Sequence, residues 1–119
     1  MPPRAAFFTA LLLTASLQSE DKTGLHAGGA AIEITPTVVP FQLRSGASKA
    51  IHDPLHVRAL AFQNGEGRAA IALVDAIGVG REMTDAAKAE VAEKTGWPVT
   101  AMLVSATHTH TAPKGGDSS

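Results

Sequence analysis

The stretch Ala69-Ala70-Ile71-Ala72-Leu73-Val74 decides the fold of this 119-residue chain. Six apolar residues in a row, bounded by a glycine-rich turn and an aspartate, are typical of an interior β-strand covered on both faces. Residues 55–63 come before this run, and their side chains alternate between two sets, as in a strand. Between the two segments, Asn64-Gly65-Glu66-Gly67 tolerates the positive φ angles of a tight turn. The sequence therefore predicts an antiparallel hairpin over residues 55–75.

The segment after the hairpin predicts a helix over Arg81–Thr95. Its apolar face is formed by residues spaced i, i+4 and i+8, namely Met83, Ala87 and Val91. Charged residues occupy the other face, the helix should lie on the sheet, and Gly96 ends it. Residues 99–106 form the next apolar strand, so strand, helix and strand make a βαβ unit with parallel strands and a right-handed crossover. The predicted fold class is α/β with a mixed sheet, as part of a larger catalytic domain.

The first part of the chain carries weaker patterns. Residues 21–29 form a polar, glycine-bearing lead-in, and residues 30–35 alternate as a short strand that Pro36 stops. Residues 41–50 show no period, which predicts a loop.

The composition narrows the functional classes. The chain has 10 Lys plus Arg against 11 Asp plus Glu, so it lacks the positive charge of a nucleic-acid binder. It has no cysteine, which excludes disulfides, thiolate metal sites and a cysteine nucleophile. Any metal must therefore be held by histidine, carboxylate or other oxygen ligands.

The amino terminus predicts export. A positive start is followed by the apolar run Ala5-Ala6-Phe7-Phe8-Thr9-Ala10-Leu11-Leu12-Leu13 and then by small residues, as in a signal peptide over residues 1–19. The apolar run is shorter than the roughly 18 residues that cross a membrane. We expect residues 20–119 to be periplasmic or secreted, with no integral membrane segment after signal removal.

The expected site lies where the last strand ends, at Thr107-His108-Thr109-His110. Histidines spaced i, i+2 point the same way in an extended chain, so both imidazoles would look into one site. Imidazole is the commonest protein ligand for zinc-like metals, and loops at the carboxyl ends of strands hold the sites of α/β proteins. The alternative is a polar loop whose histidines contact only water.

Two further residues enter the candidate site. Asp75 ends the interior strand at the edge where His108 emerges, so its carboxylate could bind a metal or orient a ligating imidazole. Alternatively, Asp75 only accepts backbone N–H groups of the turn that follows it. His52 precedes Asp53 in a turn, where a His-Asp pair is usually structural.

Four blocks carry a family resemblance: Gly29-Ala30-Ala31-Ile32-Glu33-Ile34-Thr35-Pro36, Ile51-His52-Asp53-Pro54-Leu55-His56-Val57-Arg58-Ala59-Leu60, Leu73-Val74-Asp75-Ala76-Ile77-Gly78 and Ala106-Thr107-His108-Thr109-His110-Thr111-Ala112-Pro113. In this order and spacing, over about residues 28–113, they resemble the opening of the neutral/alkaline ceramidase family. The resemblance implies an exported zinc-dependent amidase that hydrolyses the N-acyl amide of ceramide-like lipids to a sphingoid base and a fatty acid.

The resemblance also implies roles for individual residues. His108 matches the first histidine of the family's His-Thr-His motif, which ligates zinc, and His110 is then the catalytic residue that contacts substrate or supports the metal-bound water. Zinc would polarise the amide carbonyl and lower the pKa of a bound water toward ~7. His52 and Asp75 match positions in the pocket or behind the metal ligands.

The sequence departs from the family at several positions. Thr111-Ala112-Pro113 stands where the family has Ser-Gly-Pro, and the chain has no tyrosine, although the family's zinc site uses a later histidine, a glutamate and a tyrosine. Those ligands would lie beyond residue 119, so we expect an incomplete amino-terminal part of the enzyme that is inactive alone. The alternatives are another metal-dependent amidohydrolase and a non-catalytic exported module with a weak histidine metal site.

Overall fold

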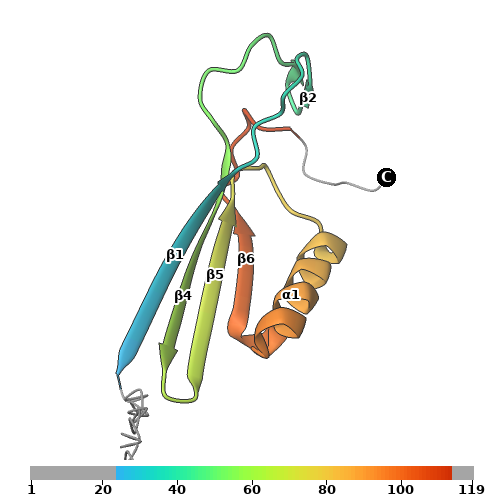
Figure 1. Ribbon diagram of the computed structural model, residues 1–119. Coiled ribbons are helices and arrows are strands. Elements are labelled where there is room, and N and C mark those ends of the chain that lie inside the picture. Colours follow the sequence, from blue (N-terminus) through green and yellow to red (C-terminus); the bar gives the residue numbers. More distant parts are fainter. Residues whose placement is uncertain (1–23, 114–119) are drawn as a thin grey trace, which may run out of the picture.

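A four-stranded sheet with one helix beside it forms the body of the computed structural model, which describes residues 24–113 (Figure 1). The strand order is β1–β4–β5–β6, with bounds Leu25–Glu33, His56–Asn64, Gly67–Val74 and Met102–Ala106. The first three pair antiparallel, and β5 pairs with β6 in parallel. The predicted α/β class with a mixed sheet is confirmed.

The hairpin of β4 and β5 has the predicted turn. Asn64 pairs with Gly67, so Gly65 and Glu66 are the two central residues of a tight loop. Gly65 has a φ of 56°, which costs a glycine little because it has no Cβ. β5 lies between β4 and β6, which confirms its interior position in the sheet.

Helix α1 spans Arg81–Thr95, as predicted, and ends at Gly96. Gly96 has a φ of 71° and donates its backbone N–H to Ala92 O at 2.8 Å, which closes the last turn. The helix lies beside β6 (Figure 1). Its apolar stripe stays about half exposed, with Met83 at 49% and Val91 at 43%. Its packing on the sheet is therefore looser than expected.

Three boundaries differ from the sequence prediction. β1 begins at Leu25, because its backbone pairs with β4 over nine residues and this edge pairing does not need large side chains. The first three residues of the predicted last strand form the 3-10 helix η1 (Val99–Ala101), in which Ala101 N–H donates to Pro98 O at 2.9 Å. The predicted loop contains a small hairpin of β2 (Gln42–Leu43) and β3 (Gly46–Ala47).

One face of the sheet is open to solvent, so the prediction that β5 is covered on both faces is wrong. The cross-strand register places five large apolar side chains on that face: Leu60, Phe62, Ile71, Leu73 and Leu103. They are 36–57% exposed. Within residues 24–113 the buried apolar residues are Ala76 and Ala112, which belong to the loops after β5 and β6. The least exposed apolar residues therefore lie at the carboxyl edge of the parallel pair.

The membrane and export predictions concern other parts of the chain. Among the described residues, no helix has both the length and the apolar character needed to span a membrane. The predicted signal peptide, residues 1–19, lies outside the described residues.

Candidate metal site at the carboxyl edge of the sheet

The candidate site is built where β5 and β6 end side by side. Val74 and Ala106, the last residues of these strands, are register partners. The backbone N–H of Thr107 donates to Val74 O at 2.9 Å and extends this pairing by one residue. The loop that carries the histidines therefore starts directly beside the loop that begins with Asp75, as the βαβ unit predicts.

His108 has a fixed ring orientation. Its Nδ1 lies 2.7 Å from Ile77 O, in the loop after β5. A carbonyl oxygen only accepts hydrogen bonds, so Nδ1 carries the proton and the Nε2 lone pair is free. Histidines that bind metals commonly donate their other ring N–H to a carbonyl or carboxylate in this way. Nε2 of His108 is therefore the ring nitrogen that could bind a metal.

The backbone of His108 is unusual. It has a φ of 61°, the left-handed conformation, and among the described residues no other non-glycine residue has a positive φ. Histidine tolerates this conformation better than most residues, and such strained positions are concentrated at functional sites. The assumed extended conformation of the His-Thr-His segment is therefore wrong, because the chain turns at its first histidine.

The two imidazoles are neighbours even so. The ring centroids of His108 and His110 are 5.1 Å apart, with an angle of 76° between the ring planes. Both residues are exposed, so their free nitrogens are open to solvent. The turn at His108 thus brings the two rings together, which the alternation of side chains along an extended chain was expected to do.

Asp75 makes a clasp between β4 and β5. Its Oδ2 accepts the backbone N–H of His56 at 2.9 Å and Nη1 of Arg58 at 2.9 Å, and its own N–H donates to His56 O at 2.9 Å. The backbone N–H of His56, together with the Arg58 guanidinium, holds the pKa of Asp75 below its ordinary value. None of the hydrogen bonds found within residues 24–113 joins Asp75 to His108 or His110. Its closest hydrogen bonds go to β4 instead of to the turn that follows it, and the side chain of Thr107, the residue before His108, also lowers the pKa of Asp75.

Arg58 and His56 complete this clasp, and the sequence reasoning missed them. Arg58 Nη2 donates to Nδ1 of His56 at 3.1 Å, so the ring accepts at this nitrogen. The two residues share a strand face at spacing i, i+2, and the hairpin register puts the start of β4 opposite the end of β5. The ion pair between Arg58 and Asp75 could have been predicted from that register.

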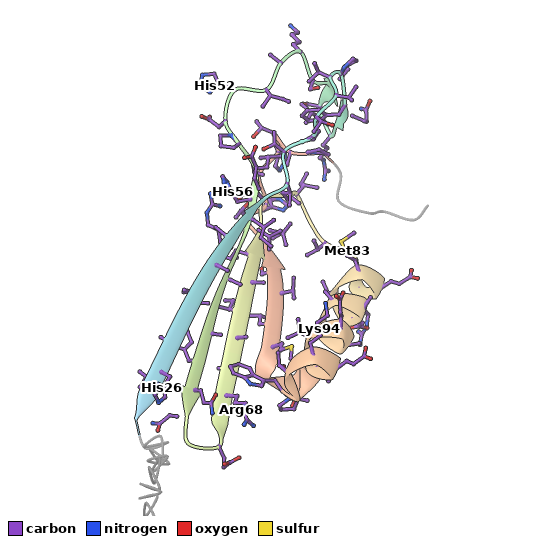
Figure 2. The ribbon with its side chains drawn as sticks, viewed as in Figure 1. His26, His52, His56, Arg68, Met83 and Lys94 are labelled. Atoms are coloured by element: carbon purple, nitrogen blue, oxygen red, sulfur yellow. The ribbon has the colours of Figure 1, made fainter. Side chains whose placement is uncertain are left out.

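His52 stands apart from the histidine pair. It is 94% exposed in its side chain and contacts Asp53 at 3.0 Å, in the long loop between β1 and β4 (Figure 2). It lines a pocket of about 560 Å³ that also includes Thr111, the residue after His110. His52 is therefore connected to the site only through this pocket.

The arrangement brings together two possible metal ligands, the imidazoles of His108 and His110. Within the described ranges, no group of three or more His, Cys, Asp or Glu residues is placed to hold an ion. The oriented His108 and its neighbour His110 suit zinc, whereas Asp75 is engaged elsewhere. Comparison with models of known protein families gives no match, and neither does comparison with curated proteins.

Proposed function

We propose that this chain forms the amino-terminal part of the active site of an exported zinc-dependent amidase similar to the neutral ceramidases. Such an enzyme hydrolyses the N-acyl amide of ceramide-like lipids to a sphingoid base and a fatty acid. The observation that supports the proposal most is the bond from His108 Nδ1 to Ile77 O, which leaves Nε2 free beside His110. The alternative, a polar loop whose histidines contact only water, does not explain the bond from His108 to Ile77 O or the left-handed backbone of His108.

Each residue then has a distinct task. His108 binds zinc through Nε2, and the carbonyl of Ile77 fixes its ring. His110, whose ring lies against that of His108, contacts the substrate or moves a proton at one of its nitrogens. Zinc, when bound, polarises an amide carbonyl and makes a water molecule more acidic. Asp75 and Arg58 hold the ends of β4 and β5 together beneath the two loops.

The number of ligands sets the expected activity of this chain. A catalytic zinc is usually held by about three protein ligands and keeps one open position. Two imidazoles are available in the described part of the chain. We therefore expect zinc binding in the micromolar range and no amidase activity from these 119 residues alone.

Isothermal titration of the 119-residue chain with zinc tests the proposal. We expect binding of one ion per chain, lost in His108→Asn and weakened in His110→Asn. Asparagine is chosen because it tolerates the left-handed backbone at position 108, so that a loss reports the ligand and not the fold. His26→Asn is the matched control, since His26 lies near the far end of the sheet (Figure 2).

Three results would contradict the proposal. Zinc binding that survives His108→Asn would place the ion elsewhere. Absence of binding would favour a non-catalytic exported module. Release of fatty acid from a ceramide analogue by this chain, with loss on chelation, would show that the chain already holds a complete set of zinc ligands.

A further inference from the structure

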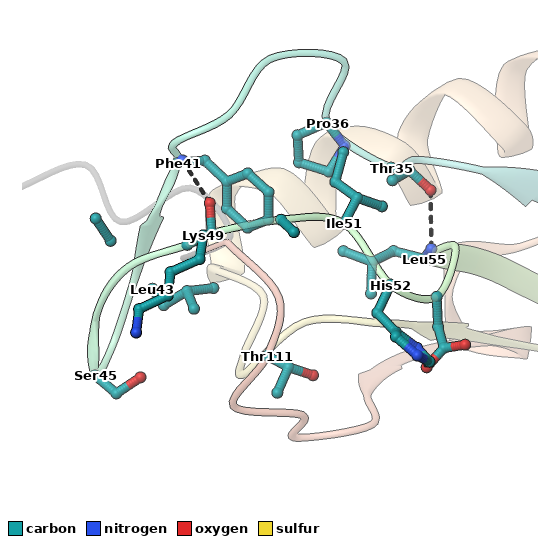
Figure 3. Close-up of a pocket in the computed structure, with 14 residues that line it drawn as sticks. Thr35, Pro36, Phe41, Leu43, Ser45, Lys49, Ile51, His52, Leu55 and Thr111 are labelled. Atoms are coloured by element: carbon teal, nitrogen blue, oxygen red, sulfur yellow. Dashed lines mark hydrogen bonds and ion pairs between the residues drawn. The ribbon is translucent and has the colours of Figure 1, made fainter.

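The pocket beside the histidine loop has the size and lining of a ligand site (Figure 3). Its volume of about 560 Å³ falls within the range of about 300–1,000 Å³ that small-molecule sites occupy. Its apolar walls come from the chain between β1 and β4, namely Pro36, Phe41, Leu43, Ile51 and Leu55. These five side chains give the pocket a concave apolar surface.

Hydrogen bonds join residues that line the pocket on different segments of the chain. Phe41 N–H donates to Ser48 Oγ at 2.8 Å, and Ser48 N–H returns a bond to Phe41 O at 2.9 Å. At the other end, Leu55 N–H donates to Thr35 Oγ1 at 2.9 Å. Figure 3 shows the first and last of these bonds on opposite sides of the pocket. Ser48 is only 8% exposed, so its pair of bonds forms a buried part of the frame.

The charged residues of the pocket lining are Lys49 and Asp53, and they differ in whether they have a partner. The carboxylate in its lining is Asp53, which is paired with His52 at 3.0 Å. Lys49 also lines the pocket and makes no ion pair with any described residue. Its side chain runs past Leu43 along the wall opposite His52 (Figure 3). The pocket therefore combines an apolar interior with one ammonium group free to meet an anion.

We propose that this pocket binds a monoanionic amphiphile, with the apolar body against Phe41 and Leu55 and the anionic head at Lys49. Thr111 belongs to the lining, so the ligand would lie beside the histidine loop. The proposal does not depend on zinc or on amide hydrolysis, because the walls, the frame and the lysine belong to the loop between β1 and β4. A neutral amphiphile of the same length would fill the walls without using Lys49.

Titration calorimetry with decanoate, in the presence of a chelator, tests this proposal on the 119-residue chain. The chelator separates it from the zinc proposal, since a carboxylate can also bind a metal. We expect one decanoate per chain, with 1-decanol binding about three- to fivefold more weakly, as an exposed ion pair provides. Lys49→Ala should remove the preference for decanoate, and Lys49→Arg should keep it. Lys94→Ala, which removes a lysine from the distant helix α1, should change nothing.

A pair of apolar variants locates the ligand. Phe41→Ala should weaken both ligands, and Leu60→Gln, on the exposed face of the sheet, should weaken neither. The proposal is overturned if decanoate does not bind, if Lys49→Ala leaves the preference unchanged, or if Leu60→Gln abolishes binding. The last result would place the amphiphile on the open face of the sheet.

Discussion

Removal of the Asp75 carboxylate should destabilise the fold by a calculable amount. In Asp75→Ala the backbone N–H of His56 loses its acceptor in a partly buried position, which costs about 1–3 kcal/mol. The ion pair with Arg58 adds less than about 1 kcal/mol, since the arginine side chain is 54% exposed. We therefore expect a loss of about 1–4 kcal/mol in the free energy of unfolding, which is large beside the roughly 5–15 kcal/mol that stabilises a typical folded protein.

The pH dependence has a definite sign. The pKa of Asp75 is lower in the folded chain than its ordinary value of 3.8, so the folded state favours the charged form. The stabilisation is fully present above pH 3.8 and is lost as the pH falls through the folded-state pKa. Asp75→Asn keeps an oxygen acceptor for His56 N–H but has no charge to titrate. The variant should therefore lack only the part of the stability that wild type loses in acid.

Urea unfolding at about pH 7 and about pH 3 measures both effects. The matched control is Asp85→Ala, since Asp85 pairs with Arg81 at 3.4 Å on the exposed surface of α1 and should contribute close to nothing. If Asp75→Ala and Asp85→Ala destabilise the chain equally at neutral pH, the clasp between β4 and β5 does not exist as described. If wild type and Asp75→Asn lose the same stability in acid, the lowered pKa is refuted.

Two further predictions concern conformation. The long-range ¹H–¹⁵N NMR spectrum of His108 at about pH 8 should show the neutral ring protonated at Nδ1, because Ile77 O accepts that proton, and the opposite tautomer would contradict the metal-ligand assignment. Gly96→Ala should cost about 1 kcal/mol through its left-handed φ alone, because no atom crowds a Cβ there, whereas Gly78→Ala, equally open but without a positive φ, should be near neutral in thermal unfolding.

The fold could be predicted where one segment carries a complete local signal. The hairpin needed only an apolar run, an alternating run and a glycine turn, and α1 needed only its period and Gly96. The start of β1 could not be predicted in this way, because Ala27, Gly28 and Gly29 have no strand-forming side chains. Their strand conformation comes from pairing with β4. Periodicity also identifies an apolar face without showing what covers it, as the open face of β5 demonstrates.

The site was harder to predict because its bonds join segments distant in sequence. The clasp links Asp75 to Arg58, 17 residues away, and the ring of His108 is fixed by a carbonyl 31 residues away. A strand-edge motif could locate the two histidines, but no local pattern records a carbonyl partner. Asp75 was selected for its position at the edge, and its lowered pKa follows from partners that only the register supplies.

The free nitrogen of His108 follows from the two loops together. Thr107 N–H on Val74 O fixes where the second loop starts, and the left-handed turn at His108 then brings Nδ1 to Ile77 O. A one-residue slip of β6 against β5 would move the histidine to the other face of the sheet and away from that carbonyl. The same His-Thr-His segment without Ile77 O in reach would have no preferred tautomer. The defined tautomer of His108, on which the proposed zinc site depends, therefore follows from the parallel register of β5 and β6, and the motif alone does not provide it.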